Sequence, residues 1–357
     1  MGATHQERLP RPTLAGIGKQ LGVSRQTIWN VIHHPEEVGE ETRQRVLAAI
    51  RETGYRPSTA ARALRTSRSL TIALRLSSML DGINGALMDR FVHALSQAVQ
   101  HHDYRLSLFS AHDADAETYH LDDLHRRLAI DACVLTDTGF NDTRPRRLRA
   151  LGLPFAAFGR PWGDPEAAHP WVDIDGRDGT RQAAEYLRQL GHTEIGFLGW
   201  PVGSGVGDDR RRGWLEGCAP RAADAARLAL AVTDEPRHGA QAAEELLNRG
   251  ATAIVCASDS LAIGAAGVYS HRIAGGSALP ITGFDDTPVA AALGLTSVAQ
   301  PVEEAAEVVT TALLAILQGR DSDDPQQTLL KPRLVVRRLE PFVSRLAGAV
   351  PLPPRYQ

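Results

Sequence analysis

The stretch Leu21-Gly22-Val23-Ser24-Arg25-Gln26-Thr27-Ile28 decides how the first part of this chain folds. The glycine in this stretch is typical of a residue that ends a helix, and Ser24 is suited to cap the next one. Upstream, Leu14, Ile17 and Leu21 repeat at a spacing of three to four residues, which predicts a helix with one apolar face. The stretch is therefore predicted to be the turn between two short helices.

Three helices are predicted around this turn. The first runs over 14–21 behind the N-cap Thr13, the second over 25–32, and the third over about 40–53, before Gly54. A helix, a short glycine-containing turn, a second helix and a bracing third helix form the helix-turn-helix unit. In that unit the second helix enters the major groove of DNA, so this part of the chain is predicted to bind DNA.

The polar face of the second helix carries groups that suit the reading of bases. Arg25, Gln26 and Asn30 point away from the predicted apolar face of this helix. Arginine matches the paired acceptors of guanine, while glutamine and asparagine match the donor and acceptor of adenine. Trp29 has two interpretations: it contacts thymine methyl groups or the sugar-phosphate edge, or it packs against the third helix.

The segment after Gly54 is predicted to be a linker that becomes ordered on DNA. Pro57 breaks the chain, and Ser58 or Thr59 can cap a helix of about two turns that is basic and rich in alanine. A segment too short to fold alone is expected to order on contact with a partner. Leu64 is its only sizeable apolar side chain, and it suits a wedge between base steps in the minor groove.

The net charge of −3 conceals a division along the chain. Residues 1–68 contain 11 Lys and Arg against 6 Asp and Glu, and the other 289 residues contain 28 against 36. A basic start on an acidic remainder favours a DNA-binding head on a non-DNA-binding body. The chain shows neither an apolar run of membrane-spanning length nor a secretory signal, which predicts a cytoplasmic protein. The three cysteines are far apart, which excludes a disulfide scaffold and a zinc finger.

At this point the head resembles the LacI/GalR family of bacterial repressors. The matching stretches, in order, are 13–14, 21–28, 40–47 and 54–57. The resemblance implies DNA-binding roles for Thr13, Ser24, Arg25, Gln26, Thr27, Trp29, Asn30, Tyr55, Ala61 and Leu64.

The chain departs from the family pattern in three places. Gly16 and Gly18 replace better helix formers, at a cost of about 1 kcal/mol each. Trp29-Asn30 stands where Ser-Arg is common, which alters the expected base preference. Gly39 stands in place of a serine cap, which costs only a few tenths of a kcal/mol.

The remainder of the chain alternates short apolar runs with helical patterns. This alternation predicts parallel sheets covered on both faces, and about 275 residues fit two such sheets better than one. The predicted strands are 70–76, 105–109, 132–136, 154–158, 194–198, 228–232, 251–257 and 279–284, and the clearest helices are 88–100, 179–190, 240–248 and 302–318.

The predicted fold class is an N-terminal all-α helix-turn-helix head followed by an α/β body of two doubly wound parallel-sheet lobes. The resemblance implies that this body is similar to periplasmic binding proteins. The predicted parts are a head over 1–56, a hinge helix or linker over 57–68, a body over 69–344 and a proline-containing tail over 345–357. Within the body, lobe 1 is predicted over about 69–167 and 298–326 and lobe 2 over about 168–297 and 327–344, with the proline-rich 160–170 as a crossing between them.

Ligands of open parallel sheets bind at the carboxyl ends of the strands. The dipeptides that follow the apolar runs are Thr136-Asp137, Gly159-Arg160, Gly199-Trp200, Ser258-Asp259 and Asp285-Asp286. Carboxylates and arginine make paired hydrogen bonds to vicinal hydroxyl groups, and an indole stacks on the C–H face of a sugar. The sequence therefore predicts a cleft that binds a polyhydroxylated ligand.

The family resemblance continues through the body and covers about 330 residues. The segment 203–213, the run 256–259, the run 283–286 and the run 296–301 are similar to family motifs, and they imply effector contacts for Arg210, Ser258 and Asp285. Arg160, Trp200 and Asn84 complete the candidate effector-binding residues. A structural role as helix cap is the alternative for Asp259 and Asp286.

These features predict a ligand-responsive repressor that binds a palindromic operator as a homodimer and responds to a sugar or a sugar-derived effector. A purine or nucleoside corepressor on the same architecture is the main alternative, and a sugar-binding receptor is a distant one, since it would need a signal sequence and no head. No spacing typical of a nucleotide loop, a zinc protease or a calcium loop is present, so the sequence predicts no enzyme activity, cofactor or metal.

Overall fold

The computed structural model describes residues 13–54, 68–76, 83, 85–219, 225–272, 280–320 and 325–337. The chain divides into two compact units, Met1–Ser69 and Leu70–Gln357. We call them the head and the body. Among the helices that the structure describes, none combines the length and the apolar character needed to cross a bilayer.

The head contains the three predicted helices. They are α1 (Leu14–Leu21), α2 (Arg25–His33) and α3 (Glu40–Thr53), with the short 3-10 helix η1 (Pro35–Glu37) between the last two. A small core of Ile17, Ile28, Val31, Val46 and Ala49 holds them together. The prediction of the helix-turn-helix unit is confirmed, and the second helix is one residue longer than expected.

Glycines set the turns of the head. Gly22 and Gly54 adopt positive φ values of 68° and 63° as they end α1 and α3, a conformation that other residues adopt only with strain. Gly18 has a different reason. A Cβ at this position would lie 2.8 Å from the carbonyl oxygen of Val23, so the close return of the chain after α1 requires a glycine.

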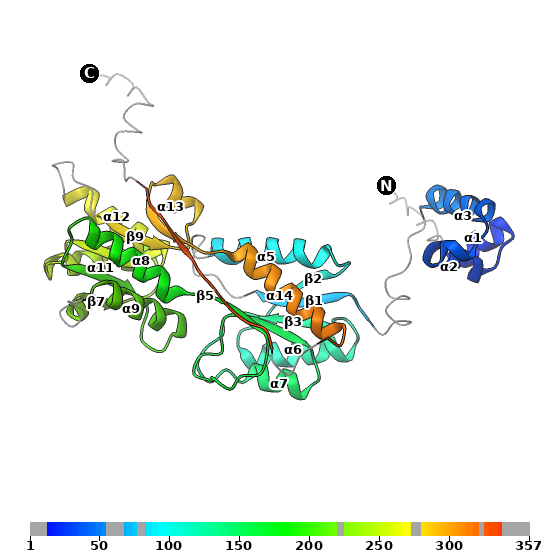
Figure 1. Cartoon of the computed structure of the whole chain (residues 1–357), viewed down its shortest axis with the longest axis horizontal. Helices are drawn as coiled ribbons and strands as arrows, with labels where there is room; N and C mark the ends of the chain where they lie inside the picture. Colours follow the sequence, from blue (N-terminus) through cyan, green and yellow to red (C-terminus); the bar gives the residue numbers. More distant parts are fainter. Residues whose placement is uncertain are drawn as a thin grey trace, which may run out of the picture. The chain divides into compact units, whose positions relative to one another are not determined.

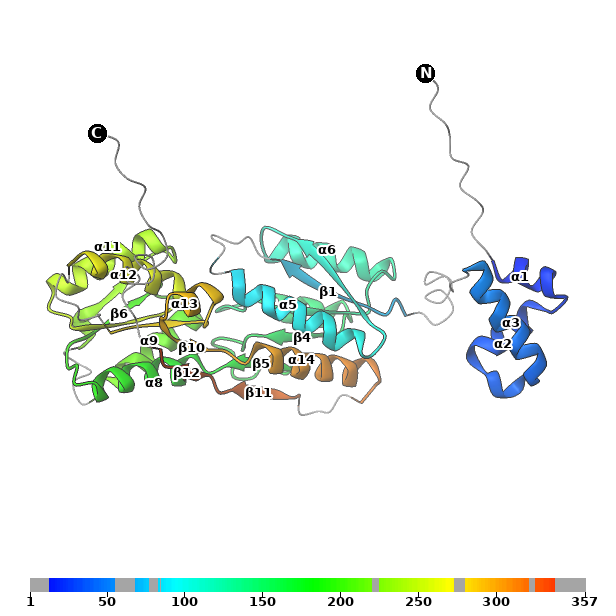
Figure 2. The ribbon, with the colours of Figure 1, turned by 90° about the horizontal axis from the view of Figure 1, so that it is seen from above.

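The body consists of two six-stranded sheets, which we call sheet A and sheet B (Figures 1 and 2). Sheet A has the order β11-β5-β4-β3-β1-β2 and is parallel throughout. Sheet B has the order β12-β10-β9-β8-β6-β7, in which only β12 is antiparallel to its neighbour. The strands of sheet A are β1 (Thr71–Leu76), β2 (Arg105–Ser110), β3 (Ala132–Leu135), β4 (Phe155–Phe158), β5 (Trp171–Ile174) and β11 (Gln327–Leu330). Those of sheet B are β6 (Ile195–Gly199), β7 (Ala229–Ala231), β8 (Ala253–Cys256), β9 (Ile281–Phe284), β10 (Thr296–Ala299) and β12 (Arg333–Val335).

Helices cover both faces of each sheet, as the alternating pattern predicted. Sheet A is packed between α5 and α14 on one face and α6 and α7 on the other. Sheet B is packed between α8 and α9 on one face and α11, α12 and α13 on the other. The helices are α5 (Gly85–Gln100), α6 (Ala114–Arg126), α7 (Arg144–Ala150), α8 (Gly176–Gln189), α9 (Gly205–Gly217), α11 (Pro236–Asn248), α12 (Asp259–Arg272), α13 (Pro288–Ala292) and α14 (Val302–Leu317), with the 3-10 helix η2 (Ala226–Leu228) before β7.

The chain crosses between the lobes at places that differ from the prediction. Strands β5 and β11 were both assigned to lobe 2, but they pair with each other in sheet A, and β5 also pairs with β4. The proline-rich segment 160–170 is therefore a connection within lobe 1 and not a crossing. The crossings follow β5, β10 and β11, and α14 returns to lobe 1, where it packs beside α5 from the other end of the chain (Figures 1 and 2).

Candidate DNA-binding surface and effector cleft

The exposed face of α2 presents the predicted base-reading side chains. Arg25 and Gln26 are exposed, whereas Asn30 is half-buried. The Gln26 amide donates a 2.8 Å hydrogen bond to Asn30 Oδ1, and Asn30 Nδ2 donates to Glu37 Oε2 at 3.1 Å. The two amides are therefore linked by a hydrogen bond, and Glu37 fixes the orientation of the Asn30 amide. Sequence reasoning did not identify Glu37, because it lies beyond the end of the helix.

The polar residues at the helix starts are engaged in capping. Thr13 Oγ1 accepts a 3.1 Å hydrogen bond from the Gly16 N–H, and Ser24 Oγ accepts one of 2.9 Å from the Thr27 N–H. The hydroxyl groups of Ser24 and Thr27 are also 2.8 Å apart. These caps fix the angle at which the chain enters α1 and α2.

The other residues of the head that were predicted to contact DNA are Trp29 and three residues of the linker. The Trp29 ring is half-buried and lies 5.3 Å from the His34 ring, centroid to centroid, beside the end of α2. Tyr55, Ala61 and Leu64, predicted to contact DNA from the linker, lie outside the described residues.

In the body, the five dipeptides singled out in the sequence follow the ends of β3, β4, β6, β8 and β9. Two of them, which contain Trp200 and Asp285, contribute to one cluster around Arg210 of α9, and Arg160 lies beside it in contact with Asp209. The predicted contact Asn84 lies outside the described residues.

Arg210 is the centre of this cluster, which we call the effector cluster. Its side chain is 6% exposed, and its guanidinium lies 3.7 Å from the centroid of the Phe284 ring and 5.2 Å from that of Trp200. Nη1 donates to the Ala257 carbonyl oxygen, while Nη2 is 3.8 Å from Asp285 Oδ1. Burial lowers the Arg210 pKa, although the charges of Asp285 and Asp234 oppose this. At 3.8 Å this pair is too long for a hydrogen bond, so the two groups do not satisfy each other's hydrogen-bonding capacity.

Asp285 is held in a high-energy setting. Its φ of 105° lies in the region that favours glycine. Burial raises its pKa to about 8, although Arg210 opposes the shift, and Gln300 Nε2 donates to its Oδ1 at 2.6 Å. Strained, buried and unusually basic carboxyl groups concentrate at functional sites.

Close packing of α9 on α8 fixes the position of Arg210. A Cβ at Gly213 would lie 1.9 Å from the Arg177 carbonyl oxygen, and a Cβ at Gly217 would lie 2.6 Å from Ala184 Cβ. The two glycines are four residues apart, so they form one face of α9 that fits against α8. Across this contact, Thr180 Oγ1 donates a 2.6 Å hydrogen bond to the Arg210 carbonyl oxygen.

Arg160 links the two lobes beside this cluster. Its Nε is 2.5 Å from Asp173 Oδ2 in lobe 1, and its Nη2 is 3.1 Å from Asp209 Oδ2 in lobe 2. The guanidinium also lies 4.5 Å from the centroid of the Trp162 ring. That ring packs on the start of α9, where a Cβ at Gly205 would come within 2.2 Å of it.

The other predicted residues have clear local partners. Ser258 is buried, donates to Asp234 and accepts a 3.2 Å hydrogen bond from the Leu261 N–H at the start of α12. Asp259 accepts hydrogen bonds from the Thr287 N–H at 2.7 Å and from Ser297 Oγ at 2.6 Å. Asp259 therefore joins α12 to the segments around β9 and β10.

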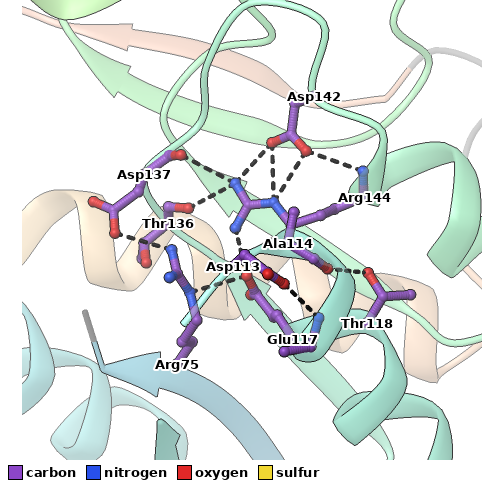
Figure 3. Close-up of polar contacts among 10 residues, drawn as sticks. Arg75, Asp113, Ala114, Glu117, Thr118, Thr136, Asp137, Asp142 and Arg144 are labelled. Atoms are coloured by element: carbon purple, nitrogen blue, oxygen red, sulfur yellow. Dashed lines mark hydrogen bonds and ion pairs between the residues drawn. The ribbon is translucent and has the colours of Figure 1, made fainter. Parts of the chain in front are cut away.

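Asp137 belongs to a separate polar network at the end of β3 (Figure 3). Arg75 lies 3.1 Å from Asp137 Oδ2 and 2.9 Å from Glu117 Oε2, and Arg144 Nη1 donates to the same Glu117 oxygen at 2.7 Å. Burial alone would lower the Arg144 pKa, but hydrogen bonding to Asp142 and the charge of Glu117 outweigh it and raise the pKa. The network braces β1, β3, α6 and α7.

Sequence reasoning missed several residues in and around the effector cluster. Asp173 was missed because β5 was not predicted, and Asp234 because it stands two residues beyond the apolar run 228–232. Asp209 and Gln300 were not predicted either, although the sequence pointed close to both. Asp209 is adjacent to the candidate Arg210, and Gln300 lies within the family motif 296–301. Trp162 lies in the segment that was read as a crossing, and no spacing marks it.

Three buried donors at the site have no acceptor among the described residues: Arg210 Nε, Trp162 Nε1 and Trp200 Nε1. Leaving a buried donor unpaired costs about 1–3 kcal/mol. Together with the loose Arg210–Asp285 pair, these donors leave hydrogen-bonding groups that suit an oxygen-rich ligand.

The comparisons with known proteins agree with the architecture of a helix-turn-helix head and a two-lobed body. The family model for bacterial regulatory proteins, lacI family, matches residues 13–58, and that for a periplasmic binding protein-like domain matches residues 184–338. The HTH-type transcriptional regulator AglR of Rhizobium meliloti is 31% identical over 340 residues, which cover 91% of this chain and 93% of AglR. The regulator CelR of Thermobifida fusca is 30% identical, over 93% of this chain and 99% of CelR.

Two solved structures have the same architecture. The complex of the transcriptional regulator CelR with cellobiose matches with a TM-score of 0.66 and 27% identity, covering 92% of this chain and 100% of that one. The Lac repressor dimer bound to operator and the anti-inducer ONPF matches with a TM-score of 0.76 and 22% identity, over 92% and 99% of the two chains, which supports the fold alone. The relatives are transcriptional regulators and not enzymes. A helix-turn-helix head on a two-lobed body, matched along most of its length by such relatives, makes this chain a member of the LacI family of HTH-type transcriptional regulators.

Proposed function

We propose that this regulator is a repressor that binds a palindromic operator as a homodimer and responds to a sugar or a sugar-derived effector in the cleft of its body. The observation that carries the effector class is the effector cluster. Arg210 and Asp285 are both buried and 3.8 Å apart, and the Arg210 guanidinium lies beside the aromatic rings of Trp200 and Phe284.

A sugar fits these groups better than an apolar ligand does. Vicinal hydroxyl groups hydrogen-bond to a carboxyl group and accept from a guanidinium at the same time, which would give both buried groups a partner. The indole offers a flat surface for C–H groups of the ring. The structure of the CelR–cellobiose complex supports this class, since that chain is 27% identical and covers 92% of this one.

Dimerisation follows from the charge distribution. The acidic body is not expected to bind DNA, so affinity has to come from two basic heads held together. Two α2 helices would enter successive major grooves about 34–36 Å apart, and the linkers would meet in the minor groove between them. Effector would act only through a difference in affinity between the DNA-bound and free geometries of the dimer.

The effector class is tested by thermal-shift measurements of the full chain with a panel of mono- and disaccharides and of purine bases and nucleosides. A sugar is expected to raise the melting temperature in wild type and in the control Glu166→Ala, an exposed position, but not in Asp285→Ala. Stabilisation by purines alone would refute the sugar and favour the purine corepressor.

The DNA-binding half is tested by gel shift on fragments around the gene that encodes the protein. We expect the protein to shift a fragment that contains a palindromic site. The variant Asp285→Ala is expected to bind the same fragment but no longer to respond to the effector. Binding that ignores salt, or no binding at all, would refute the repressor.

A further inference from the structure

We propose that the body has a second ligand site, at the edge of sheet A opposite to the cleft, and that this site takes a small organic carboxylate with an apolar body. The site is a cavity of about 550 Å³. Its wall is formed by the ends of α7 and α14 and by the segments that lead into β4, β5 and β11. Nothing in this inference rests on the proposed repressor function or on the effector cluster.

The size and the walls of the cavity match a small-molecule site. Ligand pockets commonly have volumes of about 300–1,000 Å³ and apolar walls with few polar groups. Most of the lining is apolar, and the residues are Gly152, Leu153, Pro154, Phe155, Ala168, Pro170, Ala312, Ala315, Ile316 and Pro325, joined by Arg149, His169, Arg320 and Gln326.

The charge of the lining is positive. Its described residues include two arginines, Arg149 and Arg320, and none of them is acidic. Their described hydrogen bonds go to neutral oxygens, from Arg149 Nη2 to the Ala168 carbonyl at 2.7 Å and from Arg320 Nη2 to Gln318 Oε1. Arginines near helix ends also offset the helix dipole. That role explains neither the cavity nor the histidine that lines it.

His169 is the observation that points to a ligand. The residue is 4% exposed, it lines the cavity, and its Nε2 is buried without a hydrogen-bond partner among the described residues. The ring is fixed against Phe155, with 5.2 Å between the centroids. An unpaired nitrogen held in place in a cavity that two arginines also line suits the polar end of a ligand, and the apolar walls suit its body.

The location makes such a site consequential. Sheet A is parallel, and its register places Phe155 of β4 level with Cys133 of β3 and so with Ala73 of β1. The cavity therefore lies at the same edge as the start of β1, two strands or about 10 Å away across the sheet. The chain enters the body from the head at this edge.

The test uses the full chain, with phenylacetate as the probe and neutral phenylacetamide as its matched control, in titration calorimetry. Saturable binding of phenylacetate is expected with a Kd of about 1 mM or below, and binding of phenylacetamide is expected to be weaker by about tenfold. Arg320→Gln, at an exposed position, should weaken phenylacetate by about tenfold, and Ala315→Leu should fill the cavity and abolish binding.

Two control variants locate the site. Arg127→Gln removes an exposed arginine at the end of α6, and Asp285→Ala alters the effector cluster; both should bind phenylacetate as wild type does. Absence of saturable binding, equal binding of the amide, or binding unchanged by Arg320→Gln and Ala315→Leu would each overturn the proposal. Melting temperatures of the variants within a degree or so of wild type would show that lost binding is not lost folding.

Discussion

Asp285 combines an unfavourable backbone conformation with an unfavourable electrostatic environment for its carboxyl group. It is buried, its backbone adopts a positive φ, and its opposing cation is 3.8 Å away. The sequence motif located this residue, but it could not indicate its energetic state. Burial and the distance to Arg210 decide that state, and both depend on elements more than 70 residues apart.

The raised pKa of Asp285 predicts that the free energy of unfolding of the body falls as the pH rises. The unfolded carboxyl ionises near pH 3.8 and the folded one near pH 8, so between these values the native state binds the proton and the unfolded state does not. Stability contributed by this group is present below pH 4 and is lost as the pH rises through 8, by at most about 1.4 kcal/mol per pH unit. Asp285→Asn retains the acceptor for Gln300 and removes this dependence.

The measurement is urea unfolding of wild type, Asp285→Asn and the exposed control Glu166→Gln from pH 5 to pH 8.5. The difference in unfolding free energy between Asp285→Asn and wild type should grow in favour of the variant as the pH rises, whereas the control should follow wild type. Parallel profiles for all three proteins would show that Asp285 titrates normally.

In the head, the Gln26–Asn30 pair predicts coupled effects on operator binding. Because the two amides are hydrogen-bonded at 2.8 Å, removing one alters the orientation of the other. Gln26→Ala and Asn30→Ala should each cost about 1–3 kcal/mol and relax base preference, with a coupling energy of about 0.5–3 kcal/mol in the double variant. A double-mutant cycle by fluorescence anisotropy measures it.

Arg25→Ala combined with Asn30→Ala is the matched cycle, since no hydrogen bond joins these side chains among the described contacts. Additivity in both cycles would mean that Gln26 and Asn30 act separately on DNA.

At the scale of elements, the contact between α8 and α9 decides where the effector cluster forms. Gly213 and Gly217 let the two helices approach closely enough for Thr180 to hold the Arg210 carbonyl. An alanine at position 213 would collide with backbone atoms of α8, which cannot rotate away as a flexible side chain could. The position of Arg210 is therefore a property of the helix pair.

Gly213→Ala is expected to destabilise the body by about 1–3 kcal/mol and to weaken effector binding, because α9 must shift. Gly267→Ala in α12 is the control: among the described residues, no atom outside the neighbouring backbone of α12 lies within 4 Å of its added Cβ, so the variant should gain up to about 1 kcal/mol of helix propensity. Thermal unfolding and effector titration of both variants distinguish local crowding from a general intolerance of alanine.

Elements with local signals were predictable, and elements fixed by distant partners were not. The helix α3 was predicted with its observed bounds, because capping positions and a C-terminal glycine lie within the segment. Strand β5 was missed: its four residues form a strand because β4 and β11 flank them, and β11 stands some 150 residues later. Likewise, the sequence indicated that Gly18 destabilises its helix. The reason for a glycine there, the nearby carbonyl oxygen of Val23, is visible only in the structure.

For the whole molecule, the division of charge predicts how salt acts. The affinity for operator should fall steeply with salt, with each phosphate contact of the heads contributing about −0.9 to the slope of log K against log salt. Replacement of the exposed Lys19 of α1 by glutamine should make the slope shallower by about that amount if Lys19 contacts a phosphate, and the body variant Arg126→Gln/Arg127→Gln should leave the slope unchanged. Anisotropy titrations at a series of salt concentrations measure both, and a shallower slope in the body variant would mean that the body contacts DNA.

Because the chain passes back and forth between the lobes, the parts of the molecule are completed at different times during synthesis. The helices of the head are complete at Thr53, but lobe 1 lacks the core side chains of α14 until residue 317. Sheet A lacks its edge strand β11 until Leu330, and sheet B lacks β12 until Val335. At about 5–20 residues per second, a ribosome finishes the body roughly a quarter of a minute to a minute after the head. During that interval a nascent chain carries a finished head without a finished sensor. Because neither lobe is one continuous piece, no stop within lobe 2 leaves a complete lobe 1, and chains released early are expected to become substrates for proteolysis.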